Sequence, residues 1–312
     1  MARIFQIPGL CGDIHEITGS RGESAQIAPE MGGWALAFEA VTGSGASVKT
    51  LHSDYEEMAL YPGKIRGGSP LLFPFPSWVM NGGKKDVYDV GGKLFHLPQH
   101  GFLRKLPFRV TGGDKDSSLV IETSFTPETL AVYPFEFSAQ IAFSIEQGVF
   151  TTTATFTNLS ASVPMPLAFG FHPYLPVPLS GKGSRNEMVV EMPHCTEITQ
   201  GAEDWSSHHA TPFEGGEVSI AQDFSGTRYF TQFAYGFMRL LDRTSGLALK
   251  VAWHSDTPRQ YVALWAPDTD SAYFCIEPWS HLPNAFGRPD ELAVLAPGRK
   301  TSWSLSLSVE EL

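Results

Sequence analysis

The chain has 312 residues, of which 42% are hydrophobic and 18% are charged, and its net charge is −11. These proportions are ordinary for a globular protein, and the acidic balance argues against nucleic acid or an anionic membrane as a partner. No apolar run approaches the roughly 18 residues that are needed to cross a bilayer. The three cysteines (Cys11, Cys195 and Cys275) are scattered without CxxC spacing, so neither a disulfide framework nor a thiolate zinc site is indicated.

The beginning of the chain lacks the sustained hydrophobic region of a signal peptide, and the odd number of cysteines agrees with a reducing compartment. We therefore expect a cytoplasmic protein. No linker, repeat or low-complexity tract divides the chain, and large β-sandwiches often exceed two hundred residues as one unit. The expectation is a single domain over residues 1–312, present as a monomer or homodimer.

Alternation of apolar and polar residues predicts β-strands through most of the chain. Early candidates lie at residues 34–41 and 119–125. The longest period-two run covers residues 135–146. A turn at 146–148 and a threonine-rich run from 149 follow it, and together these features predict a hairpin.

The second half of the chain repeats these signals. A turn at residues 242–246 joins two apolar runs and predicts another hairpin. Residues 273–276 and 302–309 are further strand candidates, whereas the sequence PDELAVL (289–295) is expected to form one or two helical turns. With 30 glycines and 23 prolines as punctuation, the pattern predicts an all-β fold of antiparallel sheets packed face to face.

Three segments interrupt the alternation and gather polar side chains among glycines, prolines and aromatic residues. The first segment carries Arg66, His100 and Arg104, the second, PLAFGFHPYLPV, carries His172, and the third, YFCIEPWSHLPNAF, carries Glu277. Loops at strand ends are where β folds place most of their functional residues.

Each of these residues alone also has an ordinary structural explanation. A histidine beside a proline is more often a hydrogen-bonded structural residue than a catalyst, and an arginine after glycines is often a surface charge. A glutamate at a strand end is usually solvated. The flanks of Glu277 are apolar, however, and carboxylates are seldom fully buried without a reason.

The motifs IRGGSPLLFPFP, LPQHGFLRKLPF, FGFHPYLP and CIEPW follow one another between Arg66 and Trp279. As a set they resemble the aldose 1-epimerase (mutarotase) family, in particular its aldose-epimerase-like and hexose-6-phosphate-mutarotase-like branch. The resemblance implies the galactose mutarotase-like fold, a large antiparallel β super-sandwich with a saccharide cleft on one sheet. That fold agrees with the strand pattern above.

The resemblance also implies a reaction, the interconversion of α and β anomers of a hexose or hexose phosphate by acid–base ring opening and closure. Matched motif by motif, His172 corresponds to the general acid, Glu277 to the general base, and His100 to the histidine that stabilises charge near the reacting carbon. Arg66 corresponds to an arginine that contacts sugar hydroxyls, and Arg104 is expected to buttress the site or touch substrate. No metal and no organic cofactor are implied.

The chain departs from the family pattern in two places. The context of His172 is FGFHPYLP rather than the NHxYFN type of the galactose mutarotases. The family also places an aspartate between this histidine and the glutamate to hold sugar hydroxyls. Asp223 is the best candidate here, with Asp242 and Asp256 as alternatives.

A phosphorylated substrate would require cationic groups around the phosphate. The candidates are Arg66, Arg104, Lys84 and Lys85.

Two other classes of function stay open. A carbohydrate-binding protein on the same fold would keep the cleft without turnover, although a pure binder needs no paired acid and base. A glycoside hydrolase usually needs two carboxylates about 5–10 Å apart, and one strong carboxylate candidate is found. A metal site built from His100, His172 and Glu277 lacks the HxH or HxxxE spacing that would support it.

Overall fold

The computed structural model describes residues 3–63, 65–114, 116–221, 224 and 226–312. Its sheets pair antiparallel strand by strand, which confirms the predicted all-β architecture. Within the described ranges, no helix is both long enough and apolar enough to span a membrane.

The largest sheet contains both predicted hairpins and the C-terminal strand. Its nine strands in spatial order are β11 (Arg109–Gly112), β12 (Ser118–Ser124), β13 (Phe137–Glu146), β14 (Val149–Asn158), β28 (Lys300–Glu311), β24 (Leu247–Ser255), β23 (Phe237–Asp242), β18 (Val189–Met192) and β21 (Gly216–Ser219).

A second sheet of eight strands carries the segments that the sequence singled out. Seven strands follow in the order β20 (His208–Phe213), β19 (Cys195–Gln200), β22 (Gly226–Thr231), β25 (Tyr261–Ala266), β26 (Tyr273–Trp279), β16 (Gly170–Phe171) and β6 (Leu71–Leu72), and β17 (Tyr174–Pro176) also pairs with β26.

The N-terminal part of the chain forms a five-stranded sheet, and short pairs and helices complete the fold. The five strands are β1 (Arg3–Phe5), β2 (Ile14–Thr18), β3 (Ser24–Ala28), β4 (Trp34–Val41) and β5 (Ser47–Lys49). The pairs are β7 (Met80–Asn81) with β8 (Lys84–Lys85), β9 (Val87–Val90) with β10 (Lys93–His96), and β15 (Met165–Leu167) with β27 (Ala293–Leu295). The helices are α1 (Tyr55–Met58), α2 (Pro127–Val132) and 3₁₀ turns at Leu103–Lys105, Arg185–Glu187 and Ala285–Gly287.

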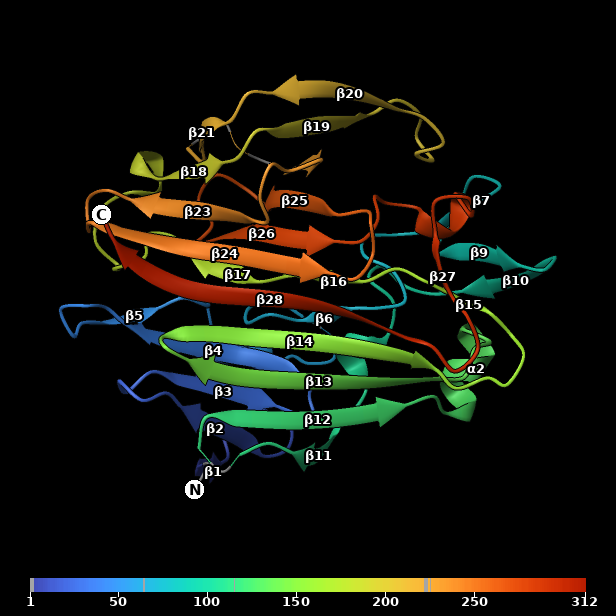
Figure 1. Ribbon diagram of the computed structural model, residues 1–312, viewed down its shortest axis with the longest axis horizontal. Helices are drawn as coiled ribbons and strands as arrows, with labels where there is room; N and C mark the ends of the chain where they lie inside the picture. The colour runs from blue at the N-terminus through green and yellow to red at the C-terminus, as the bar shows by residue number, and fades with distance from the viewer. Residues whose placement is uncertain (1–2, 64, 115, 222–223, 225) are drawn as a thin grey trace.

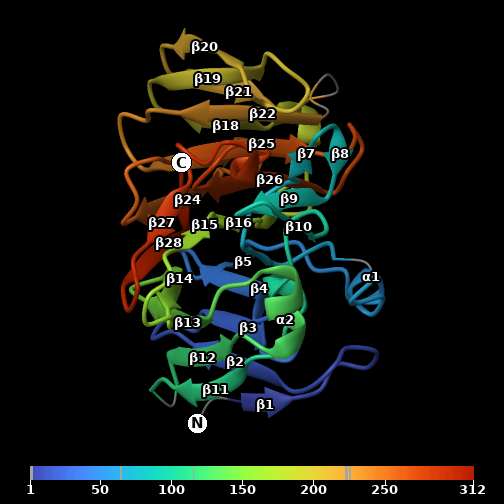
Figure 2. The same ribbon diagram turned by 90° about the vertical axis from the view of Figure 1, so that its right-hand side faces the viewer.

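The sheets stack in two layers. Figure 1 looks onto the nine-stranded sheet, with β28 crossing its middle, and the five- and eight-stranded sheets lie behind it. The quarter turn in Figure 2 shows the same two layers edge on. Between them lies an aromatic core, in which Phe73 stacks on Phe156 at a centroid distance of 4.4 Å and Phe38 stacks on Phe150 at 5.0 Å.

Most of the elements predicted from the alternation are confirmed. Residues 34–41 form β4, and both hairpins form in the expected places. The helical turn expected at PDELAVL is confirmed only in part, because residues 289–291 form a hydrogen-bonded turn, whereas Ala293–Leu295 is strand β27. A stretch this short cannot sustain a helix by propensity alone, whereas pairing with Met165–Leu167 satisfies its backbone.

Candidate active site

Strand β26 positions Glu277 through the alternation of its side chains. Phe274 and Ile276 pack in the main core, so Cys275 and Glu277 point to the opposite face of the eight-stranded sheet. Glu277 lies opposite Ala263 of β25, whose small side chain takes up little space beside it. The result is a carboxyl group only 2% exposed on the outer face of the sheet.

His172 lies in the short connection between β16 and β17. Its backbone N–H donates to the Pro70 carbonyl at 3.2 Å, and its ring stacks on Tyr174 at a centroid distance of 4.6 Å. These contacts hold the imidazole Nε2 3.4 Å from Oε2 of Glu277. Both side chains are buried, so the structure brings the expected acid and base together out of bulk water.

A tight turn around His100 explains why its segment is rich in glycine and proline. His100 and Gly101 both have positive φ, of 67° and 66°. The Ser77 backbone N–H donates to Nδ1 of His100 at 3.0 Å, and the Ser77 carbonyl accepts from the His100 backbone N–H at 2.5 Å. Because Nδ1 accepts, the neutral ring carries its proton on Nε2. The ring centroid lies 5.5 Å from that of His172.

The two expected arginines reach the same site in different environments. Arg66 is exposed at the rim, whereas Arg104 is half-buried and donates from Nη2 to the Gln99 carbonyl at 3.0 Å. Its buried Nε has no hydrogen-bond partner in the described part of the chain. Arg104 therefore places a fixed positive charge beside the His172–Glu277 pair.

A cavity of about 260 Å³ joins these groups. Its lining includes five of the six residues singled out from the sequence, namely Arg66, His100, Arg104, His172 and Glu277. Residues that the sequence analysis missed also line it, namely Ser77, Gln99, Thr227, Tyr229 and Trp265. Tyr174 and Trp279 complete its aromatic walls.

The alternative aspartates in the described part of the chain do not join this cavity. Asp223 lies outside the described residues. Asp242 instead accepts backbone hydrogen bonds from Leu179 and Ser245, and Asp256 accepts one from Ser302. These two aspartates fix turns and strand ends.

Two lysines that had been considered for a phosphate also lie elsewhere. Lys84 and Lys85 are exposed on β8, where the Lys85 ammonium lies over the Trp78 ring. Neither of them lines the cavity.

Burial shifts every titrating group at the floor of the cavity toward its neutral form. It raises the pKa of Glu277 well above the ordinary value, an effect that Trp279 and the Arg104 charge oppose. Burial, reinforced by Arg104, lowers the pKa of His172 to about 3 and lowers that of His100 well below its ordinary value. A neutral imidazole beside a protonated carboxyl holds the same single proton as an imidazolium beside a carboxylate. One transfer between the two residues interconverts these forms.

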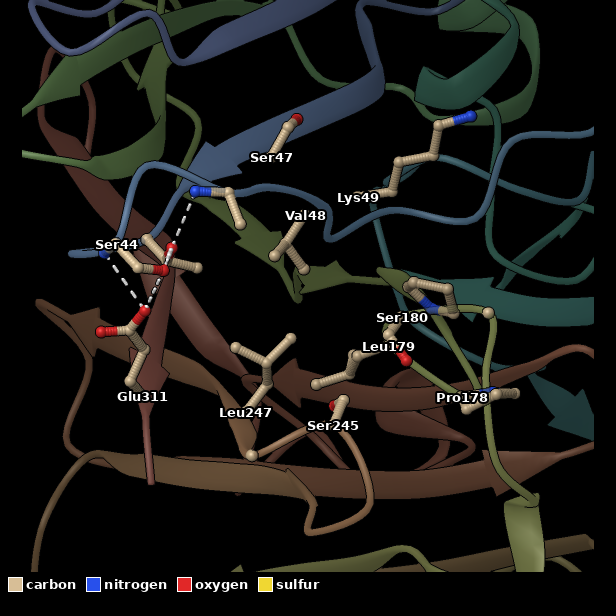
Figure 3. A pocket seen from close by; sticks show the side chains of 15 residues that line it. Ser44, Ser47, Val48, Lys49, Pro178, Leu179, Ser180, Ser245, Leu247 and Glu311 are labelled. Atoms are coloured by element: carbon tan, nitrogen blue, oxygen red, sulfur yellow. Dashed lines mark hydrogen bonds between the residues drawn. The ribbon is translucent and has the colours of Figure 1, made fainter.

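A larger cavity, of about 720 Å³, lies elsewhere in the molecule and contains none of the expected site residues. Figure 3 shows its serine hydroxyls and the aliphatic side chains of Val48 and Leu247, with Glu311 hydrogen-bonded to Ser44 at its edge. No buried acid–base pair is among the residues that line it. The smaller cavity is therefore the candidate active site.

Comparison with solved structures defines the class of fold. The protein Slr1438 from Synechocystis sp. PCC 6803 superposes with a TM-score of 0.81 at 22% identity, covering 99% of both chains. A galactose mutarotase-like protein from Clostridium acetobutylicum gives 0.80 at 18% identity, covering 100% of this chain and 99% of that one. A galactose 1-epimerase from Lactobacillus acidophilus NCFM gives 0.69 at 11% identity, with 100% and 99% coverage. The fold is galactose mutarotase-like.

Sequence comparison gives the family. A family model described as aldose 1-epimerase matches residues 45–308, and the chain belongs to the aldose 1-epimerase family. The chain is also 26% identical over 192 residues to the uncharacterized protein YphB of Escherichia coli K12. That match spans 57% of this chain and 62% of the length of the E. coli protein.

Proposed function

We propose that this protein is an aldose 1-epimerase that interconverts the α and β anomers of a hexose or hexose phosphate. The observation that carries the proposal is the buried His172–Glu277 pair, with its 3.4 Å separation, at the floor of a small polar cavity. Anomer exchange needs a base at the C1 hydroxyl and an acid at the ring oxygen, and the pair supplies one of each.

The proposed reaction begins when the Glu277 carboxylate takes the proton of the C1 hydroxyl while protonated His172 gives a proton to the ring oxygen. The C1–O5 bond breaks, and an open-chain aldehyde forms. Rotation about C1–C2 presents the other face of the aldehyde, and the two residues exchange roles for ring closure. Because the pair shares one proton at the start and at the end, no net proton is gained or lost. Each assisted transfer is expected to contribute about 10²–10⁴-fold.

His100 and Arg104 support this chemistry electrostatically. The hydrogen bond from Ser77 to Nδ1 leaves the Nε2–H of His100 available to donate to an oxygen that gains charge. The Arg104 guanidinium favours the carboxylate form of Glu277, which is the form that acts as base. Both groups are fixed before substrate arrives, so neither has to reorganise during the reaction.

The size and charge of the cavity bear on the substrate. At about 260 Å³ it is smaller than the roughly 300–1,000 Å³ typical of pockets for drug-sized ligands, which suits a single sugar ring. Arg66 at the rim and Arg104 deeper inside favour a sugar that carries negative charge, such as a hexose phosphate. The aromatic rings of Tyr174 and Trp279 are suited to the apolar faces of a pyranose. The free thiols of all three cysteines support a cytoplasmic setting.

The test follows anomer equilibration of pure α-D-glucose, α-D-galactose and glucose 6-phosphate by polarimetry or NMR exchange. We expect wild-type protein to accelerate at least one of them, and Glu277→Gln and His172→Asn to lower kcat/KM by at least about 10²-fold. Glu136→Gln and His254→Asn, at exposed positions outside the cavity, are the matched controls and should retain wild-type rates. Wild-type protein that binds a sugar without accelerating any of the three would support a carbohydrate-binding protein instead.

A further inference from the structure

Cys275 lies beside the acid–base pair, although the proposed reaction does not use it. Two residues before Glu277 on β26, it points to the same face of the sheet, and it is fully buried. One ligand atom each from His172, Cys275 and Glu277 lie within 4.8 Å of one another. An imidazole nitrogen, a thiol sulfur and a carboxylate oxygen are thus close neighbours beside the cavity.

One ligand atom of this group lacks the hydrogen bond that a buried polar atom normally has. Oε2 of Glu277 is buried and makes no hydrogen bond in the described part of the protein, and its ion-pair neighbour is Nε2 of His172 at 3.4 Å. Around them pack Tyr174, Tyr273 and Trp265, which form an apolar cluster with Cys275. These rings supply Oε2 of Glu277 with no hydrogen bond in the described part of the protein.

We propose that His172, Cys275 and Glu277 form a zinc-binding site whose occupation shuts off the active site. Zinc accepts this mixture of sulfur, nitrogen and oxygen ligands, with bonds of about 2.0–2.3 Å. In a tetrahedral site such bonds place ligand atoms about 3.3–3.8 Å apart. The His172–Glu277 separation of 3.4 Å already lies in that range, and the thiol needs a shift of about 1 Å at most.

The donor set also selects among metals. Magnesium and calcium prefer oxygen ligands, and a site with one carboxylate beside a thiol and an imidazole offers them too few. Zinc and cobalt(II) bind such sets well, the thiol giving up its proton on binding. The fourth ligand position faces the cavity, because His172 and Glu277 both line it, and a water or a sugar hydroxyl can fill it.

Inhibition follows from which groups the metal occupies. A zinc ion bound to the imidazole and the carboxylate blocks both proton transfers and competes with sugar for the cavity. This consequence rests on the proposed function, whereas metal binding itself does not. The two parts therefore need separate measurements.

Binding is tested with Co²⁺, because a thiolate bound to Co²⁺ gives a near-ultraviolet charge-transfer band that other ligands do not. We expect the band in wild-type protein and its loss in Cys275→Ala. Cys195→Ala removes another buried cysteine, and Cys11→Ala removes the exposed one; both should retain the band. Absence of the band in wild-type protein, or its persistence in Cys275→Ala, would overturn the proposal.

Affinity and inhibition are then measured with Zn²⁺ alone. By calorimetry, Cys275→Ala and His172→Asn should each weaken zinc binding by at least about tenfold, since loss of even an outer partner costs 10–100-fold. Inhibition is measured relative to each variant's own rate without zinc. Cys275→Ala should need a correspondingly higher zinc concentration for the same degree of inhibition. Equal affinity in wild type and Cys275→Ala contradicts the site. If the Co²⁺–thiolate band appears but the protein accelerates none of the sugars, the zinc site is supported and the proposed epimerase activity is rejected.

Discussion

At the residue scale, the burial of His172 and Glu277 is not explained by a contribution to the stability of the fold. Burying a charged carboxylate costs several kcal/mol unless it is compensated, and burial moves the pKa of both groups toward the neutral form. Each group lowers the free-energy cost of burying the other, because one proton shared between them leaves the pair without net charge. A protein selected for stability alone would place apolar side chains at these positions.

A third buried histidine, outside the candidate active site, allows the effect of burial on a histidine pKa to be tested separately. His281 follows strand β26, and its Nε2 lies 2.6 Å from the Glu291 carbonyl while its Nδ1 lies 3.1 Å from the Ser280 hydroxyl. Burial lowers its pKa from 6.5 to about 4, a change that Arg288 and Arg259 reinforce and Glu291 opposes. The folded protein therefore keeps this ring neutral.

The sign of the resulting pH effect follows from proton uptake. Between pH 6.5 and about 4 the unfolded chain binds a proton at His281 that the folded chain does not. The free energy of unfolding therefore falls as the pH drops through this window, by on the order of 3 kcal/mol from this group. We expect His281→Asn to flatten the pH dependence of urea unfolding between pH 7 and 4. His254→Asn, at an exposed position of β24, should leave the slope as in wild type, and an unchanged slope in His281→Asn would contradict the assignment.

The sequence led to some site residues and missed others for a physical reason. His172, Glu277 and His100 stand out because they break the alternation beside proline or glycine. Tyr229 and Trp265 lie within strands, where the same alternation that marks a buried core face also marks a cavity wall. Distinguishing the two requires the register that places Tyr229 opposite Ala263, and thereby near Glu277. A single sequence does not contain that register.

At the scale of elements, the turn at residues 98–101 depends on glycine for a steric reason. A Cβ on Gly101 would lie 2.1 Å from the Phe73 carbonyl oxygen, and this residue has a φ of 66°. Gly91, between β9 and β10, has a φ of 61° with no atom within 4 Å of such a Cβ. The two glycines share a positive φ, but only at Gly101 would an added Cβ clash with a neighbouring atom.

This difference gives a matched pair of variants. Gly91→Ala should cost only the conformational penalty, about 1–2 kcal/mol. Gly101→Ala should cost clearly more in urea unfolding, because the Phe73 backbone or the turn must also move. It should lower anomer exchange as well, since His100 moves with the turn. Equal losses of stability in the two variants would show that the clash relaxes without consequence.

Long, regular elements were predictable, whereas short ones were not. The strands β13 and β14 bury alternate side chains over ten residues each, and a pattern of that length is unambiguous. Helix α2 was missed although Thr126 and Thr129 form a reciprocal cap and Pro127 occupies its first turn. Its six residues are too few for a 3.6-residue period to appear.

At the scale of the whole molecule, the C-terminal strand links the two layers. β28 lies between β14 and β24 in the middle of the nine-stranded sheet. From it the Trp303 ring reaches Phe169, at a centroid distance of 5.4 Å, and Phe169 packs on Phe171 at 4.8 Å. Phe171 directly precedes His172, so this chain of aromatic contacts runs from the nine-stranded sheet to the segment that carries His172.

Trp303 is therefore expected to matter for both the stability and the geometry of the site. Trp303→Ala should lower the free energy of unfolding by about 3–5 kcal/mol, as large buried aromatic truncations do, and Trp303→Phe should recover much of it because a ring still fills the space. Leu94→Ala, at a position 55% exposed on β10, is the surface control and should change stability by no more than about 0.5 kcal/mol. If Trp303→Ala destabilises no more than Leu94→Ala, the layers are held together elsewhere. If it destabilises as expected but leaves anomer exchange intact, the segment carrying His172 is positioned by its own sheet, through β16 and β17, without help from the opposite layer.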